Sequence, residues 1–106
     1  MEYIEDIDLS QLAGFEWDKG NLNKNRLKHN VEPSECEEVF FNTPIIILPD
    51  EKHSNLEKRF KVIGVTGNGR RLSLAITIRN NKIRIIMARD QSKKEKALFE
   101  AERVKR

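Results

Sequence analysis

The sequence predicts one α+β domain in which two N-terminal helices precede a four-stranded antiparallel sheet of meander topology and a C-terminal helix follows it. The chain of 106 residues has the length of one typical domain. Apolar residues make up 38% of the chain and fall in periodic blocks, which favours a folded core over disorder. Because helix-like and strand-like blocks occur in separate runs, the helices are expected to pack on one face of the sheet.

Residues 1–14 form an N-terminal arm ahead of the predicted domain, which covers residues 15–106. The arm mixes acidic and apolar side chains, a pattern that fits a short helix and an extended segment equally well. Asp18 is placed to cap the first helix, which is expected to run to about His29. Asn30 tolerates the left-handed conformation that often ends a helix.

The second helix and the strands follow directly. Pro33 suits the first position of a helix, and the segment of residues 42–44, Asn-Thr-Pro, is expected to end that helix. Short runs rich in β-branched residues, separated by turn residues, predict the four strands. These strands are expected at residues 45–48, 57–66, 70–79 and 82–89.

A C-terminal helix is predicted after the sheet. Ser92 and Glu95 have the spacing of a capping box, in which each side chain accepts a hydrogen bond from the other residue's backbone N–H. Apolar residues at helical spacing predict the stripe that faces the sheet. This stripe consists of Ala97, Leu98, Ala101 and Val104.

The turn between the last two strands determines their register. Side chains alternate across a strand, and a two-residue turn decides which residues lie opposite each other. Taking residues 80–81, Asn-Asn, as that turn pairs Thr77 with Arg84 on one face. The same register predicts two further pairs, Leu74 with Met87 and Ser73 with Ala88.

The preceding hairpin brings a second arginine to that face. A three-residue loop at residues 67–69 places Arg59 beside Thr77. A two-residue loop would instead bury Arg59 and Lys61, and burying unpaired charge is costly. A face carrying Arg59, Thr77 and Arg84 suits a phosphate group, although the solvated face of an antiparallel sheet shows the same pattern.

Charge and cysteine content narrow the classes of protein to which this chain can belong. The net charge of +3 and the basic C-terminal residues 82–106 favour polyanion binding. One cysteine, Cys36, excludes an internal disulfide framework, and with two histidines it excludes the usual zinc clusters, so no metal or cofactor is expected. No apolar run approaches the roughly 20 residues of a membrane helix and no signal peptide is evident, so a cytoplasmic location is expected.

An ordered series of short motifs resembles the BrnT-type toxins. The series consists of Phe15-Glu16-Trp17-Asp18, Asn25, Lys28-His29, Val31, Phe40, Pro49-Asp50, His53-Ser54, Glu57, Arg59-Phe60, Ile63-Gly64, Gly69-Arg70, Thr77, Arg84-Ile85-Ile86, Ala88-Arg89 and Lys94-Glu95. It covers roughly Phe15 to Glu100. The resemblance implies the toxin of a type II toxin–antitoxin pair, with a fold similar to the RelE ribonucleases and a BrnA-like antitoxin as partner.

The chain departs from this family pattern near its C-terminus. Phe99 stands where relatives commonly carry a tyrosine, so no hydroxyl is present there to share a proton. Met87 and residues 90–92, Asp-Gln-Ser, replace more usual small or basic residues before the last helix.

The activity implied by the resemblance is that of an endoribonuclease. Metal-independent RNA cleavage needs a base for the 2′-hydroxyl, cations for the phosphate and an acid for the leaving oxygen. His53 or Glu57 is the candidate proton carrier, and His53 is favoured because histidine ordinarily titrates near pH 6.5. The candidate catalytic cations are Arg59, Arg79 and Arg84, and the candidates for wider RNA binding are Lys82, Arg89, Lys93 and Lys94. In an alternative interpretation, His53 and Glu57 only order their loop, with Glu57 paired to Arg59 or a lysine.

The expected function is cleavage of RNA, free or on the ribosome, which inhibits translation and is neutralised in a hetero-oligomer with the antitoxin. Contact with DNA is expected only through the antitoxin, and no membrane association is expected. Two alternatives belong to other classes: a non-catalytic basic module that binds RNA or protein, and a structural domain that interacts through its apolar surface. The first would tolerate loss of His53 or Glu57, and the second would tolerate loss of Arg59 or Arg84.

Overall fold

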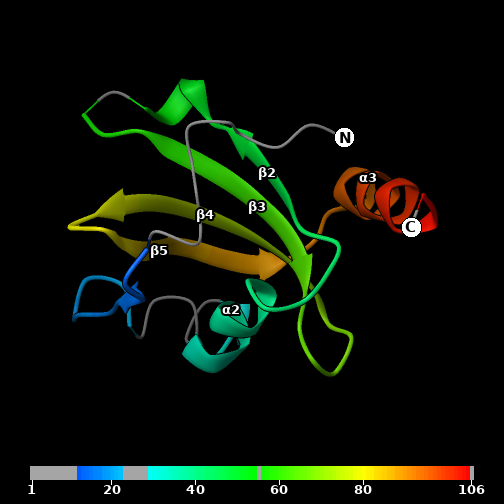
Figure 1. Ribbon diagram of the computed structural model, residues 1–106, viewed down its shortest axis with the longest axis horizontal. Coiled ribbons are helices and arrows are strands. Elements are labelled where there is room, and N and C mark those ends of the chain that lie inside the picture. Colours follow the sequence, from blue (N-terminus) through cyan, green and yellow to red (C-terminus); the bar gives the residue numbers. More distant parts are fainter. Residues whose placement is uncertain (1–11, 23–28, 55, 106) are drawn as a thin grey trace.

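The computed structural model describes residues 12–22, 29–54 and 56–105, which form one sheet with a helix on each face (Figure 1). The strands are β1 (Phe15–Glu16), β2 (Ile46–Pro49), β3 (Arg59–Val65), β4 (Arg71–Arg79) and β5 (Lys82–Asp90). The helices are α2 (Pro33–Val39), a short 3-10 helix (Glu51–His53) and α3 (Lys93–Val104).

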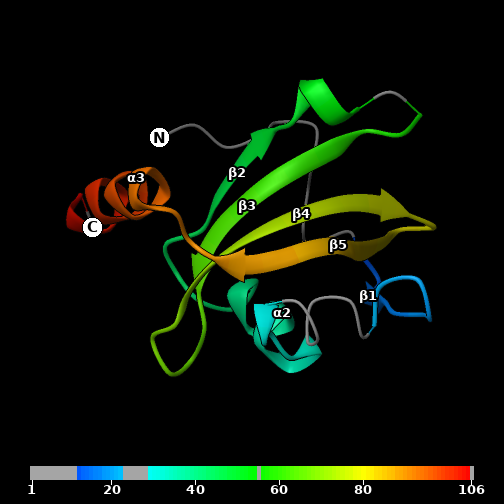
Figure 2. The same ribbon diagram turned by 180° about the vertical axis from the view of Figure 1, so that it is seen from behind.

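The predicted four-stranded antiparallel sheet is wrong, because the sheet has five strands in the order β1-β5-β4-β3-β2 and is mixed. Strands β2 to β5 form the expected antiparallel meander, but β1 adds to β5 in parallel, as Figure 2 shows. Two residues, Phe15 and Glu16, pair with Ile83 and Arg84. A strand this short has no alternating pattern, so sequence periodicity does not reveal it.

The predicted pair of N-terminal helices is also wrong for the part of the chain that the structure describes. Residues 18–22, which were expected to open the first helix, form turns in which Leu22 N–H donates to Asp18 O at 2.8 Å. Asp18 also bonds the Gly20 backbone with its carboxylate, so its capping capacity serves a turn. The rest of that predicted helix, residues 23–28, lies outside the described residues. The predicted left-handed Asn30 is confirmed by its φ of 54°.

The predicted alignment of Arg59, Thr77 and Arg84 is confirmed by the strand register. The three-residue loop is confirmed as well, since Thr66 N–H donates to Arg70 O at 2.9 Å across residues 67–69. The predicted pairs of Leu74 with Met87 and Ser73 with Ala88 are wrong.

An irregularity in β5 explains these two errors. The register shifts between Ala75 and Ile76, so Met87 lies opposite Ala75 and Ala88 lies opposite Leu74. A β-bulge inserts one residue into one strand and moves every later side chain of that strand to the other face. Met87 and Arg89 therefore lie on the face opposite α2.

The two faces of the sheet have separate apolar clusters. On the first face, Cys36 and Val39 of α2 pack against buried residues such as Val62 and Leu74. On the second face, Phe99 of α3 packs against Ile46 and Ile63. In Figure 1, α3 lies beside only one end of the sheet, whereas the 3-10 helix lies near the other end.

The predicted capping box of α3 is confirmed, but its predicted apolar stripe is wrong. Ser92 accepts a hydrogen bond from Glu95 N–H, and the reciprocal bond is also present. The side chains that α3 buries are Glu95, Phe99 and Glu102, whereas Val104 is 71% exposed. Because Glu95 is buried with cationic partners, the inward face of α3 is not the most apolar one.

Candidate functional site

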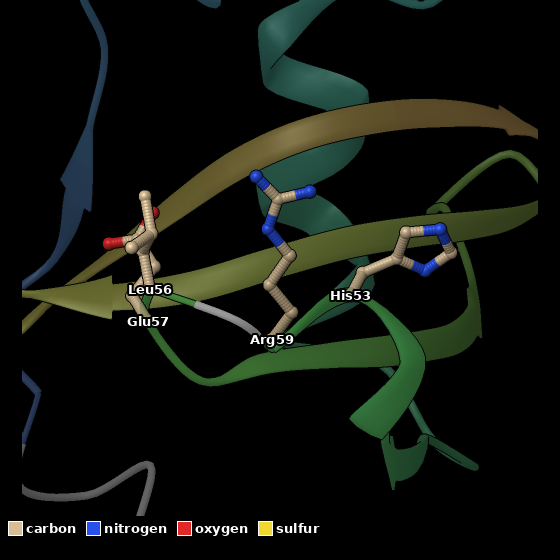
Figure 3. A pocket seen from close by; sticks show the side chains of 4 residues that line it. All are labelled: His53, Leu56, Glu57 and Arg59. Atoms are coloured by element: carbon tan, nitrogen blue, oxygen red, sulfur yellow. The ribbon is translucent and has the colours of Figure 1, made fainter.

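The loop between β2 and β3 is closed by three hydrogen bonds. Asp50 N–H donates to Arg59 O at 2.9 Å, which joins the end of β2 to the start of β3. Ser54 Oγ donates to Asp50 O at 2.6 Å and accepts from Arg59 N–H at 2.9 Å. These bonds hold the 3-10 helix against β3, so that His53 and Arg59 lie next to each other (Figure 3).

His53 is oriented by a carboxylate that the sequence argument did not assign a role. Its Nδ1 lies 3.1 and 3.0 Å from the two carboxylate oxygens of Asp50. With the proton on Nδ1, the ring donates to Asp50 and leaves Nε2 as an acceptor. The sequence signal that could have revealed the role of Asp50 is its spacing of three residues from His53 in a tight turn. The His53 side chain is 57% exposed, so a bound substrate could reach it.

Arg59 differs from the other candidate catalytic arginines in its surroundings. Its backbone N–H is bonded to Ser54, but its guanidinium has no ion-pair partner among residues 12–22, 29–54 and 56–105. In Figure 3 this side chain rises from the start of β3 on the same side as His53. A guanidinium with free donors is suited to bind phosphate oxygens.

Arg79 and Arg84 are instead paired with carboxylates. Arg79 Nη2 lies 2.9 Å from Glu57 Oε1, so the ion pair of Glu57 that the structure shows is with a third arginine. Arg84 Nη1 lies 2.9 Å from both Glu16 Oε1 and Asp18 Oδ2. Hydrogen bonding to Asp18 raises the pKa of Arg84, and the same bond lowers the pKa of Asp18. Arg84 therefore fastens β1 and the following turn to β5.

Arg89 is also paired with a carboxylate. It lies at the end of the second face that α3 covers. Glu95 of α3 bonds Arg89 Nη1 at 2.8 Å, Lys61 Nζ at 2.8 Å and Ser73 Oγ at 3.1 Å. Burial by itself would raise the pKa of Glu95. Hydrogen bonds from Arg89 and Lys61 outweigh burial and hold that pKa well below its usual range. This cluster joins α3 to β3, β4 and β5.

The remaining candidate residues do not gather into one patch. Lys82 begins β5, whereas Lys93 and Lys94 follow the other end of that strand, and all three are exposed. Thr77 lies in the predicted register but is only 1% exposed, and its hydroxyl donates to Lys58 O at 2.7 Å. The structure thus brings His53, Glu57 and Arg59 together and separates them from the lysines.

His53 lines two neighbouring cavities. The first, of about 260 Å³, is lined by His53, Leu56, Glu57 and Arg59. The second, of about 410 Å³, lies over the open part of the second face and includes Lys61, Ser73, Ala75 and Met87. The shared histidine makes these cavities two parts of one candidate site.

Cys36 lies in the core, and burial raises the pKa of its thiol to about 12. Such a thiol is not a nucleophile near neutral pH. None of the helices in the described part of the chain is long and apolar enough to span a membrane.

Comparison with known proteins places this chain in a family. The model of the family described as "Ribonuclease toxin, BrnT, of type II toxin-antitoxin system" matches residues 17–95, which is more than half of the chain. No curated protein matches the sequence. The matched range includes His53, Arg59 and both cavities. The chain therefore belongs to the BrnT family of ribonuclease toxins of type II toxin–antitoxin systems.

Proposed function

We propose that this toxin is an endoribonuclease whose active site lies on the open part of the second sheet face, with His53 as the proton carrier and Arg59 as the phosphate-binding cation. One observation carries the proposal. A histidine oriented by a carboxylate and an arginine without an ion-pair partner in the described chain line the same cavity. That pairing supplies the base and the electrostatic stabilisation that RNA cleavage requires.

The proposed reaction uses the 2′-hydroxyl of RNA as nucleophile. His53 Nε2 takes the proton of this hydroxyl while the 2′-oxygen forms a bond to phosphorus. The bond from phosphorus to the 5′-oxygen breaks, which leaves a 2′,3′-cyclic phosphate and a 5′-hydroxyl that takes its proton from the protonated His53. Arg59 donates to the phosphate oxygens, where negative charge increases in the transition state. These residues act without a metal ion.

Asp50 acts in this scheme as a positioning residue for His53. Its carboxylate accepts from Nδ1–H, which leaves Nε2 free to accept a proton from the substrate, and it stabilises the imidazolium that forms. Asp50→Asn should therefore lower kcat by roughly tenfold with little change in KM. Nitrogen NMR of the His53 ring supplies a readout that a purely structural role would not change, namely the fraction of Nδ1-protonated tautomer.

Arg79, Arg84 and Glu57 contribute indirectly in this proposal. Their ion pairs set the position of β1 and of the β2–β3 loop around the site. A cation already held by a carboxylate gains less from a phosphate than a free one does, since it must give up its partner.

The biological setting follows from the family. The toxin is proposed to cleave RNA in the cytoplasm, free or on the ribosome, and so to inhibit translation. A BrnA-like antitoxin with acidic residues would associate rapidly with the exposed cations and cover the site in a hetero-oligomer. DNA would then be contacted only by the antitoxin.

The test is an RNA cleavage assay in EDTA with purified, antitoxin-free protein, with and without ribosomes. We expect cleavage products that end in a 2′,3′-cyclic phosphate, and their loss in His53→Gln. Lys96→Ala is the matched control, because this cation is exposed on α3 and lines neither cavity. RNA that is bound but never cut, in the presence or absence of ribosomes, would contradict the proposal and favour the non-catalytic binding module.

A further inference from the structure

The bulge in β5 changes which residues line the second face. Without it, Met87 would point into the core and lie opposite Leu74. With it, Met87 lies opposite Ala75, and both side chains are partly exposed in the cavity of about 410 Å³. Bulges often occur beside active sites, where they redirect a side chain. The bulge therefore adds an apolar side chain to the part of the second face that α3 leaves open.

The 410 Å³ cavity has an apolar floor and a polar rim. Leu48, Ala75 and Met87 contribute the floor, and Asp50 and His53, whose side chains are partly exposed, contribute polar groups at the rim. A volume of this size falls in the range of about 300–1,000 Å³ that is typical of small-ligand sites. A flat, apolar group with polar edges fits such a lining.

Lys61 and Arg89 complete the wall of the cavity as cations that are already held by a carboxylate. Both are bonded to Glu95, which fixes their side chains and offsets one of their two charges. An additional phosphate is thus less favoured here than beside Arg59. An arginine plane held in place and a methionine sulfur are groups against which aromatic rings stack.

We propose that this cavity binds a nucleobase, namely the base of the nucleotide whose 2′-hydroxyl attacks. In a ribonucleotide the 2′-oxygen lies between the carbon that bears the base and the carbon that bears the 3′-phosphate. His53 is shared by the Arg59 cavity and the apolar cavity in the same way. A nucleotide with its 2′-hydroxyl at His53 would place its phosphate at Arg59 and its base over Ala75 and Met87. Asp50, whose side chain is partly exposed, is the polar group available to the base edge.

This inference rests on the proposed function, but its test does not require turnover. The folded chain is titrated with inorganic phosphate, with a nucleoside and with nucleoside 3′-monophosphates of the four bases. NMR signals are followed at the Arg59 side chain and the Met87 methyl group. We expect phosphate to shift only Arg59, and at least one nucleotide to shift both signals and bind at least tenfold more tightly than phosphate.

Substitutions in the floor separate the base from the phosphate. Ala75→Phe fills the cavity with a side chain that strands tolerate well, so it should remove the tenfold gain and leave phosphate binding unchanged. Met87→Ser makes the floor polar without adding bulk, and it gives a second variant if the first does not fold. Phe41→Ser is the matched control, because this phenylalanine is 79% exposed beside Phe15 and outside both cavities.

The outcomes distinguish the two proposals. Nucleotides that bind no more tightly than phosphate, or that keep their affinity in both folded floor variants, would overturn the nucleobase site. Base-dependent binding that the floor variants abolish, in a protein that cuts no RNA, would support the nucleobase site and count against the ribonuclease mechanism. RNA cleavage with unchanged rate and cut positions in both floor variants would support the ribonuclease mechanism and count against the nucleobase site.

Discussion

The cations at the two ends of the second sheet face differ in whether a carboxylate is paired with them. At the end covered by α3, Lys61 and Arg89 share a carboxylate that is only 8% exposed, so their charges join a helix to the sheet. At the other end, Arg59 has no such partner among the described residues, beside a histidine that is oriented by Asp50. Charge on a sheet face therefore does not identify a binding site by itself. The absence of a compensating carboxylate identifies the cation that is available to a ligand.

The largest expected effect concerns the compensated end. Glu95→Ala leaves Lys61 and Arg89 without their shared partner and removes one of the links between α3 and the sheet. Breaking a buried ion pair on one side typically costs about 3–5 kcal/mol, and we expect a loss of unfolding free energy in that range. Chemical denaturation measures it.

Glu100→Ala is the control for this first experiment. Glu100 also lies on α3 and pairs with Arg71 and Arg103, but its side chain is 39% exposed. Exposed pairs contribute little, so this variant should unfold almost as the parent does. Equal destabilisation by the two substitutions would remove the distinction between the covered and the exposed carboxylate.

A substitution at Arg59, the end of the face without a compensating carboxylate, should change the rate of RNA cleavage and not the stability of the fold. Arg59→Ala removes a guanidinium that bonds no other described side chain, so unfolding should change little. Loss of one charge-assisted contact made mainly in the transition state costs on the order of 3 kcal/mol, or about 10²-fold in kcat/KM. Cleavage kinetics together with a thermal melt test both parts. Full activity in a folded Arg59→Ala protein would place the phosphate elsewhere.

Arg84→Ala should lower the stability of the fold and not the rate of the folded protein. Its effect should be smaller than that of Arg59→Ala. Arg84 is 12% exposed and holds Glu16 and Asp18, so its loss leaves β1 joined to β5 without these ion pairs and should cost about 1–2 kcal/mol of stability. Activity should fall only as far as the folded fraction falls. The control is Lys82→Ala on the same strand. A stable Arg84→Ala protein that has lost its activity would return Arg84 to the catalytic role that the sequence suggested.

The sequence predicted the hairpin registers because turn lengths are local and side chains alternate strictly across strands. It did not predict β1, whose two residues have too short a pattern, or the bulge that redirects Met87. For the candidate site, the sequence suggested His53 and Arg59 but treated Arg59, Arg79 and Arg84 as equivalent. Their difference depends on Glu57, Glu16 and Asp18, which are distant in sequence from at least one partner. Ion pairing between distant segments has no local sequence signal. For the same reason, the sequence did not predict that Glu95 is buried.

The smallest expected effect is the pH dependence of the compensated end. The pKa of Glu95 lies below its usual range in the folded protein, so its ion pairs stabilise the fold above the ordinary glutamate pKa of about 4.3 and this contribution is lost as the pH falls further. Glu95→Gln cannot lose a charge on acidification. The difference in unfolding free energy between the parent and Glu95→Gln should therefore be constant between about pH 6 and 7 and shrink below about pH 4.3. Urea denaturation at a series of pH values measures this difference. A difference that stays constant down to pH 2.5 would mean that the carboxylate is not the stabilising partner of Lys61 and Arg89, and the contrast between the two ends of the face would lose its physical basis.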